Sequence, residues 1–164
     1  MVNTFIPYPS FTKVAKLLDN KRLGKQRVEA YQILNILLNK TKTHGWRHHV
    51  VVHMWRGYEP ALKLYYNEIV KEWIRRGFKN NMALYKLDKK ITIPWFVTNK
   101  SVNESHKASL WRKDKFYHDK LEVKASYLGY KYIWPSKLNE EQIQELRQRK
   151  NELVEIERFA EKID

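Results

Sequence analysis

Apolar residues recur along residues 11–39 at spacings of three, four and seven, the repeat of a helix that buries one face. The repeating positions are Val14, Leu17, Leu18, Val28, Tyr31, Leu34 and Leu38. Ser10 is a suitable N-cap, and Pro7 and Pro9 keep the residues before it extended. Gly24 interrupts the pattern. We therefore expect a helix over this range that is bent or broken at the glycine.

Residues 50–78 predict a helix, a turn at Gly57 and a longer helix that ends at Gly77. The apolar face of the longer helix consists of Leu62, Tyr66, Ile69, Val70 and Trp73. Residues 106–121 again have a helical pattern, whereas residues 79–103 give mixed signals with one strand-like run, ITIPWFV. The chain thus predicts an all-α fold with long irregular loops.

A chain of 164 residues is long enough for one domain with a sizeable core. We assign residues 1–138 to a single helical domain and residues 139–164 to an added C-terminal helix. This extension carries eight acids and five bases, a net charge of −3, so the remainder of the chain carries +17. Its apolar residues are Ile143, Leu146, Leu153, Ile156, Phe159 and Ile163. They fit a helix that packs along the domain or, alternatively, self-associates with a second copy.

The net charge of +14 and the pI near 9.8 favour a polyanionic partner. Nucleic acid explains this charge better than an anionic membrane surface does. No run of 18 apolar residues and no signal peptide is present, so we expect no membrane partner and an intracellular protein. The absence of cysteine excludes disulfides, cysteine-ligated zinc and thiol nucleophiles.

One polar stripe stands out on the first long helix. Asp19, Arg22, Gln26 and Glu29 are spaced three, four and three, so a helix places them on one face where they can meet a ligand together. The cations Lys21, Lys25 and Arg27 flank this stripe. The simpler interpretation is a solvated helix face with local ion pairs.

Aromatic residues and histidines provide two further candidates. The run YLGYKYIWP contains Tyr130, Tyr132 and Trp134, and its glycine and proline suggest an exposed loop that stacks on bases. His49 and His53 have the i, i+4 spacing of metal ligands, but the spacing dictates no third ligand. We therefore expect no metal site.

The motifs RLGKQRVEA, IRRGF, HKASL, WRKDK and YKYIWP occur in this order across most of residues 2–135. Their order and spacing resemble the pyrimidine-dimer DNA glycosylase/AP lyase family, the phage-type endonuclease V. The TFIPYP and GWRHH stretches are similar to a divergent branch of that family. The resemblance implies a compact, mostly helical protein that uses neither cofactor nor metal.

The resemblance also implies a mechanism. Removal of Met1 would expose the α-amine of Val2, which attacks the sugar C1′, expels the base, and forms an imine that β-eliminates the 3′ phosphate. A carboxylate assists this chemistry. In the family a glutamate directly follows an arginine on the first helix, but here Leu23 follows Arg22. Glu29, Asp19 and Gln26 remain as candidates for the vacant role.

These observations predict a DNA glycosylase with AP lyase activity that acts on damaged or modified bases in double-stranded DNA. The expected catalytic residues are Val2, Arg22, Gln26 and Glu29, and Arg27 is expected to line the same site. The expected DNA-binding residues are Lys21, Lys25, Arg27, Arg47, His48, His106, Ser109, Arg112, Lys113, Tyr130, Tyr132 and Trp134. One alternative is a non-catalytic DNA or RNA binder. The other is a metal-dependent nuclease that uses His49, His53, Asp114 and Asp119.

Overall fold

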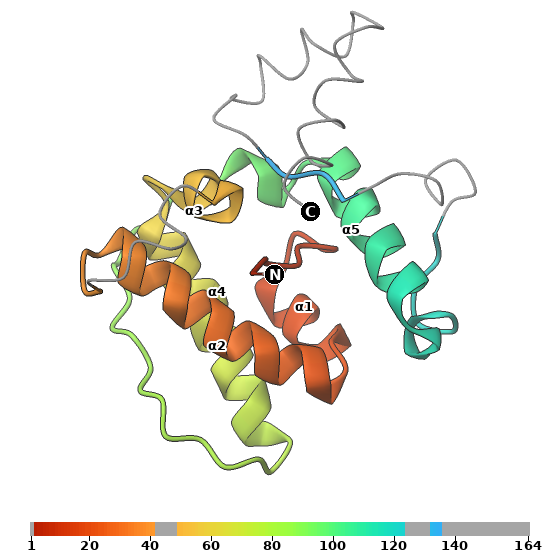
Figure 1. Cartoon of the computed structure of the whole chain (residues 1–164), viewed down its shortest axis with the longest axis horizontal. Helices are drawn as coiled ribbons and strands as arrows, with labels where there is room; N and C mark the ends of the chain where they lie inside the picture. Colours follow the sequence, from red (N-terminus) through yellow and green to blue (C-terminus); the bar gives the residue numbers. More distant parts are fainter. Residues whose placement is uncertain (1, 42–48, 124–131, 136–164) are drawn as a thin grey trace, which may run out of the picture.

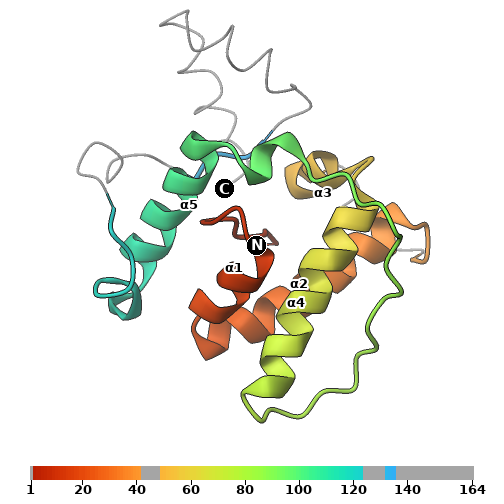
Figure 2. The same cartoon turned by 180° about the vertical axis from the view of Figure 1, so that it is seen from behind.

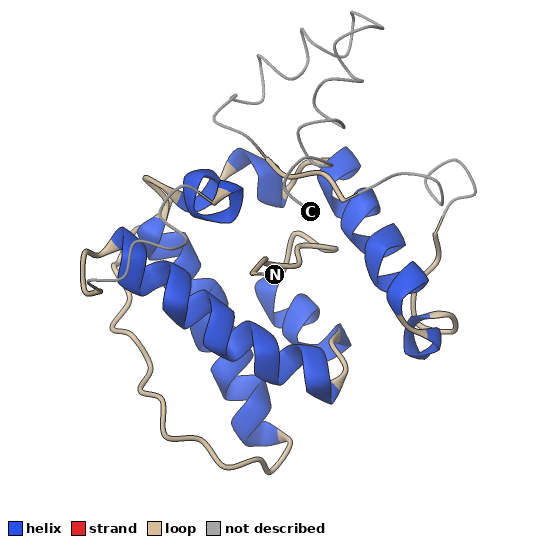
Figure 3. Cartoon of the chain, viewed as in Figure 1, coloured by secondary structure: helices blue, strands red, loops and turns tan. Residues whose placement is uncertain are grey.

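The computed structural model describes residues 2–41, 49–123 and 132–135. These residues form α1 (Phe11–Leu17), α2 (Asn20–Leu37), α3 (Val50–Trp55), α4 (Glu59–Arg75) and α5 (Lys100–Lys113), with two 3-10 turns, η1 (Trp95–Val97) and η2 (Lys115–Tyr117). The described residues contain no strand, which confirms the predicted all-α class (Figure 3). The strand-like run ITIPWFV is irregular up to Pro94 and then forms η1, so the strand signal was wrong.

The helices surround the beginning of the chain. Helix α2 packs along α4, and α1 packs on α4 next to it (Figure 1). Helix α5 lies on the opposite side of the N-terminal segment from α2 and α4, and the view from behind shows the same arrangement (Figure 2). The extended N-terminal segment therefore runs through the middle of the molecule.

Hydrogen bonds from several helices hold this segment in place. Trp55 of α3 donates its indole N–H to Thr4 Oγ1 at 3.0 Å. The Phe5 N–H donates to the Tyr65 hydroxyl of α4 at 3.3 Å, and the Ile6 N–H donates to Nδ1 of His106 on α5 at 2.9 Å. Buried backbone groups need partners of this kind, so the position of residues 3–6 is fixed by the tertiary structure.

The first helical region breaks at a different place from the one expected. Helix α2 continues through Gly24 without interruption, and the break lies at Leu18 and Asp19 between α1 and α2. Asp19 starts the new helix as its N-cap, because its carboxylate accepts the Arg22 N–H at 3.3 Å. The prediction that Gly24 bends or breaks the helix was therefore wrong.

The glycine is needed for close packing between α2 and α4. A Cβ atom at Gly24 would lie 2.9 Å from the ring of Trp73, closer than side chains pack. Trp73 also stacks on Phe78, with ring centroids 4.2 Å apart, and donates its indole N–H to the Lys79 carbonyl. The absence of a side chain at Gly24 therefore lets Trp73 pack closely against α2, and Trp73 in turn contacts the irregular segment after α4 through Phe78 and Lys79.

The other helices follow the sequence pattern closely. Ser10 caps α1 as predicted by accepting the Lys13 N–H at 3.2 Å. Gly57 and Gly77 both have φ of 87°, a value that favours glycine, and they bound α4 on either side. Leu62, Tyr66, Ile69 and Val70 of α4 are buried as predicted, and Trp73 is half-buried. Helix α5 begins before the predicted range, at Lys100.

The proposed C-terminal extension, residues 139–164, lies outside the described residues, as does its proposed self-association. Within the part of the chain that the structure describes, no helix combines the length and the apolar character needed to cross a bilayer.

Candidate active site

A pocket of about 210 Å³ opens where the N-terminal segment meets α2 and the end of α5. Its lining residues are Asn3, Phe5, Lys21, Arg22, Lys25, Gln26, Glu29 and Lys113. Three members of the predicted polar stripe therefore face one cavity, and the fourth, Asp19, contacts Arg22 beside it. Four cations and one carboxylate line the pocket, an excess of positive charge that suits an anionic ligand.

Glu29 is the carboxylate of the pocket and is only 6% exposed. Its Oε2 accepts the Asn3 backbone N–H at 3.3 Å and the Gln26 amide N–H at 3.1 Å. Burial raises the pKa of Glu29, although the hydrogen bond from Asn3 and the charges of Lys25 and Lys113 oppose this rise. A buried carboxyl group with a raised pKa is a candidate for proton transfer.

Gln26 connects the N-terminal segment to the core and is 1% exposed. Its Nε2 donates to the Asn3 carbonyl at 3.1 Å as well as to Glu29, and its Oε1 accepts the Tyr65 hydroxyl at 2.7 Å. Burial raises the pKa of Tyr65, which therefore remains a protonated hydrogen-bond donor. The tyrosine thus sets which end of the Gln26 amide faces Glu29.

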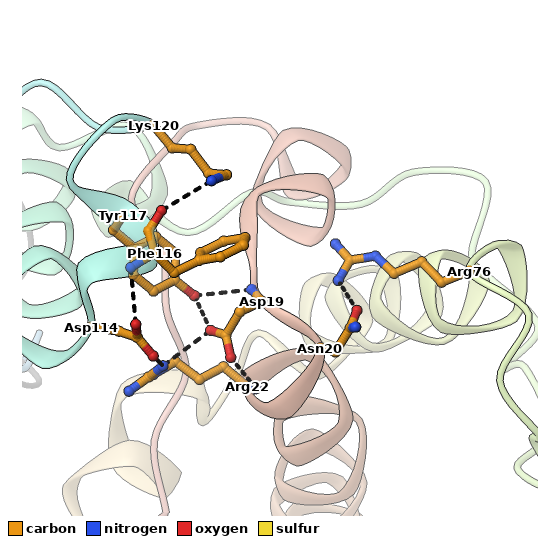
Figure 4. Close-up of polar contacts among 8 residues, drawn as sticks. All are labelled: Asp19, Asn20, Arg22, Arg76, Asp114, Phe116, Tyr117 and Lys120. Atoms are coloured by element: carbon orange, nitrogen blue, oxygen red, sulfur yellow. Dashed lines mark hydrogen bonds and ion pairs between the residues drawn. The ribbon is translucent and has the colours of Figure 1, made fainter.

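Arg22 is held at the rim of the pocket by two carboxylates (Figure 4). Its Nη1 lies 3.1 Å from Asp19 Oδ1 and 3.1 Å from Asp114 Oδ2. The Tyr117 hydroxyl also donates to Asp19. Burial alone would raise the pKa of Asp19, but the hydrogen bonds from Tyr117 and Arg22 outweigh it and hold this pKa below its ordinary value. The guanidinium is therefore positioned by charged partners that link α2 to η2.

Val2 lies directly before the residue that contacts Glu29. Val2 itself is 2% exposed and packs in the core. The next residue, Asn3, lines the pocket and bonds to both Gln26 and Glu29 through its backbone. Glu29 lies about 10 Å along the helix axis from Arg22, but the N-terminal segment follows this face, so both side chains reach the same pocket.

Of the cations expected to bind DNA, Lys21, Lys25 and Lys113 line the pocket and are exposed, and Arg112 is an exposed neighbour of Lys113. Arg27 does not line it, which corrects the expectation. Its guanidinium donates to Asn80 Oδ1 at 2.8 Å and lies 4.7 Å from the Trp73 ring, in the cluster between α2 and the segment after α4.

The expectation that His106 and Ser109 contact phosphate was wrong. Both are buried, His106 completely. The His106 ring accepts the Ile6 N–H through Nδ1, and its Nε2 lies 2.9 Å from the Ile133 carbonyl. Burial lowers the pKa of His106 to about 3, so this residue is a neutral part of the core. The motif HKASL thus supports the N-terminal segment.

Tyr132 and Trp134 are also buried, so the prediction that they form an exposed stacking loop was wrong. Tyr132 stacks on His106 with ring centroids 3.8 Å apart and donates its hydroxyl to the Thr4 carbonyl. The irregular backbone can be buried here because a side chain of α5 provides a hydrogen-bond partner for it. The N–H of Ile133 donates to Ser105 Oγ at 3.1 Å. Tyr130, Arg47 and His48 lie outside the described residues.

The proposed metal ligands are separated by the fold. His49 is the N-cap of α3, where Nδ1 accepts the Val51 N–H at 3.1 Å, and Asp114 pairs with Arg22. Among residues 2–41, 49–123 and 132–135, no group of three or more His, Asp or Glu side chains could hold a metal ion.

Asn3, Phe5 and Tyr65 belong to this site but were not identified from the sequence. Tyr65 lies among the apolar positions of α4, where an aromatic residue is ordinarily assigned to the core. The one available signal was its hydroxyl, because a buried tyrosine usually has a hydrogen-bond partner.

A comparison with protein families finds one match for this region. The family described as pyrimidine dimer DNA glycosylase matches residues 2–86, just over half of the chain. The matched range contains α1 to α4 and every lining residue of the pocket except Lys113. No curated protein and no solved structure matches the chain.

Proposed function

The chain belongs to the pyrimidine dimer DNA glycosylase family, and from this premise we propose a DNA glycosylase with AP lyase activity on damaged or modified bases in duplex DNA. One observation carries the proposal. The buried carboxylate of Glu29 is hydrogen-bonded to the backbone of Asn3, the second residue of the chain once Met1 is removed, inside a pocket lined by four cations. This contact supports a site in which the amine of Val2, the residue before Asn3, acts beside a proton-transfer group and phosphate-binding cations.

The nucleophile is the α-amine of Val2 after removal of Met1. An ordinary α-amine has a pKa of about 7.7 to 8.0 and is therefore partly neutral at physiological pH. Lys25 and Lys113 line the pocket that the next residue, Asn3, also lines, and positive charge near an amine disfavours its ammonium form. A lysine side chain would carry its proton far more of the time, so the terminal amine is the better nucleophile.

The reaction begins when this nitrogen bonds to C1′ while the bond from C1′ to the base breaks and the base leaves with a proton. The ring oxygen then leaves C1′ and takes a proton, which gives a protonated imine between Val2 and C1′. Removal of a C2′ proton next expels the 3′ phosphate with the electrons of its C3′–O bond. Water finally hydrolyses the imine and releases the enzyme.

Glu29 performs the role of the family glutamate, because the position after Arg22 holds leucine in this chain. Its carboxylate accepts the proton from the attacking nitrogen, stabilises the cationic imine, and accepts the C2′ proton. Gln26 orients Glu29 through the 3.1 Å hydrogen bond between them. Arg22, Lys21 and Lys113 bind the phosphates on either side of the attacked sugar, and such contacts position DNA without reading its sequence.

The test is covalent trapping. A duplex oligonucleotide with an abasic site is incubated with the protein and borohydride, with and without EDTA, and the adduct is mapped by mass spectrometry. We expect an EDTA-insensitive adduct on the amine of Val2, and intact mass is expected to show loss of Met1. Glu29→Gln should trap slowly. Glu68→Gln is the matched control, because Glu68 lies on α4 and pairs with Thr12 and Lys71.

A non-catalytic DNA or RNA binder is the second candidate, because the slot of the family glutamate holds Leu23, a fully buried residue. It predicts binding to the abasic duplex without an adduct. Cleavage that EDTA abolishes would instead indicate a metal-dependent nuclease and would contradict both proposals.

A further inference from the structure

Phe116 is an exposed aromatic side chain near the pocket that the proposed reaction does not use. It lies in η2, directly after α5, and is 38% exposed. Lys115 precedes it, and the ammonium of Lys120 lies 3.9 Å from the centre of its ring. An exposed phenyl ring between cations is suited to contact bases while its neighbours contact phosphates.

The backbone at Phe116 is held firmly (Figure 4). Its N–H donates to Asp114 Oδ1 at 2.9 Å, and its carbonyl accepts from Lys120 Nζ at 3.1 Å. The ring meets the buried Tyr117 edge to face, with centroids 5.0 Å apart. A side chain mounted in this way loses little conformational freedom when it binds.

The same contacts connect Phe116 to the pocket. One oxygen of the Asp114 carboxylate accepts the Phe116 N–H, and the other accepts Arg22 Nη1 at 3.1 Å. The Tyr117 hydroxyl bonds to Asp19, the N-cap of α2, from which the pocket residues Arg22 and Gln26 project. The position of the phenyl ring is thus coupled to the position of the arginine at the pocket rim.

We propose that Phe116 is a wedge that enters the base stack of duplex DNA beside the nucleotide that occupies the pocket. This inference rests on the proposed function, in which that nucleotide is abasic or damaged. Apolar wedges of this kind kink a duplex by opening a base step, which takes a few kcal/mol. A missing or unpaired base lowers that barrier, so the wedge would favour damaged sites over intact ones.

The test separates duplex distortion from chemistry. A duplex is prepared with a tetrahydrofuran abasic analogue, which cannot form an imine, and with 2-aminopurine as its neighbour, which fluoresces when it unstacks. Binding of the unaltered protein should increase the fluorescence. Phe116→Ala should abolish this increase and weaken duplex affinity roughly tenfold to hundredfold, the range expected for loss of one stacked base. Phe116→Trp should restore both.

Single-stranded DNA provides the internal control, because it has no duplex to open. Affinity for the single strand should fall much less in Phe116→Ala than duplex affinity does, because only the duplex has a base step to open. The rate of borohydride trapping on a single-stranded abasic oligonucleotide should stay the same. Ile74→Ala is the matched variant, since Ile74 is an exposed apolar residue at the end of α4. It should behave like the unaltered protein on both substrates.

The two proposals fail separately. Unchanged duplex affinity in Phe116→Ala, or no fluorescence change with the unaltered protein, would overturn the wedge even if trapping succeeds. Equal losses on duplex and single strand would also overturn it, because they would indicate a general contact. Failure of trapping with a normal fluorescence response would overturn the amine chemistry and leave the wedge supported.

Discussion

The backbone N–H of Asn3 donates a hydrogen bond to the Glu29 carboxylate over 3.3 Å, although 26 residues separate the two in sequence. This contact fixes the beginning of the chain against the middle of α2, and Gln26 strengthens it by bonding to both residues. A carboxylate in the middle of the helix thereby stands in the pocket that the proposed reaction uses.

Glu29→Gln is expected to lose activity and to change how the stability of the fold depends on pH. Removal of a proton-transfer group typically lowers a rate by 10² to 10⁴. Burial raises the pKa of Glu29 in the folded state, so the folded protein binds more protons than the unfolded chain between the ordinary pKa of 4.5 and the raised value. The stability that comes from protonation is present at low pH and is lost as the pH rises through the folded pKa.

The glutamine variant lacks this titration, so its free energy of unfolding should improve relative to the unaltered protein as the pH rises from 4 to 8. Urea unfolding at several pH values measures this difference, and trapping rates on abasic DNA measure the activity. A variant that becomes relatively less stable at high pH would contradict the raised pKa.

Tyr65→Phe is expected to impair positioning of the site. The substitution leaves Gln26 Oε1 without the hydroxyl that it accepts at 2.7 Å, and an unsatisfied buried polar group costs about 1 to 3 kcal/mol. With Gln26 less constrained, Glu29 should be less well oriented, so the single-turnover trapping rate should fall and its pH profile should shift while DNA affinity stays the same. The control is Tyr66→Phe, whose hydroxyl donates to the Ala83 carbonyl instead. Equal trapping rates and profiles in both variants would contradict the positioning role.

Lys25→Ala and Arg27→Ala should differ although the residues are two positions apart. Lys25 lines the pocket, so its removal should weaken binding to all duplex sequences alike and reduce the slope of log K against log salt by about 0.9. Arg27 donates to Asn80 and packs over Trp73, so its removal should lower stability and leave the salt slope unchanged. Titrations of labelled duplex at several salt concentrations decide this. A reduced slope in Arg27→Ala would move the DNA surface to the other side of α2.

His106 should make the protein sensitive to acid. Burial lowers the pKa of His106 to about 3, compared with 6.5 for the ordinary side chain, so between these values the unfolded chain binds the proton that the fold excludes. The stability contribution is present above pH 6.5 and is lost as the pH falls toward 3, at about 1.4 kcal/mol per pH unit. Urea unfolding measures the free energy of unfolding at pH 7.5 and at pH 5. This free energy should change less between the two pH values in His106→Gln than in the unaltered protein. The exposed His118→Gln should match the unaltered protein, and an equal pH dependence in all three would contradict the prediction.

Much of the architecture was predictable from the sequence because it depends on nearby residues. The apolar repeat predicted α4 and the helical character of α2, the hydroxyl of Ser10 gave a cap, and Gly57 and Gly77 gave the ends of α4. Val28 and Tyr31 of the predicted apolar face of α2 are exposed, which corrects that part of the prediction. The polar stripe of α2 was likewise a local feature, since a helix fixes which side chains share a face. The family resemblance agreed with the match over residues 2–86.

The residues that were misinterpreted all depend on partners far along the chain. Gly24 looked like a helix break because its neighbour Trp73 lies 49 positions away, and Tyr132 looked exposed because its partners are Thr4 and His106. The sequence by itself determined the helices, the basic charge and the stripe of side chains on α2. Only the tertiary structure decided which of these side chains meets the N-terminal segment, because that contact joins elements whose relative positions are set by packing and by buried hydrogen bonds, which no local pattern encodes.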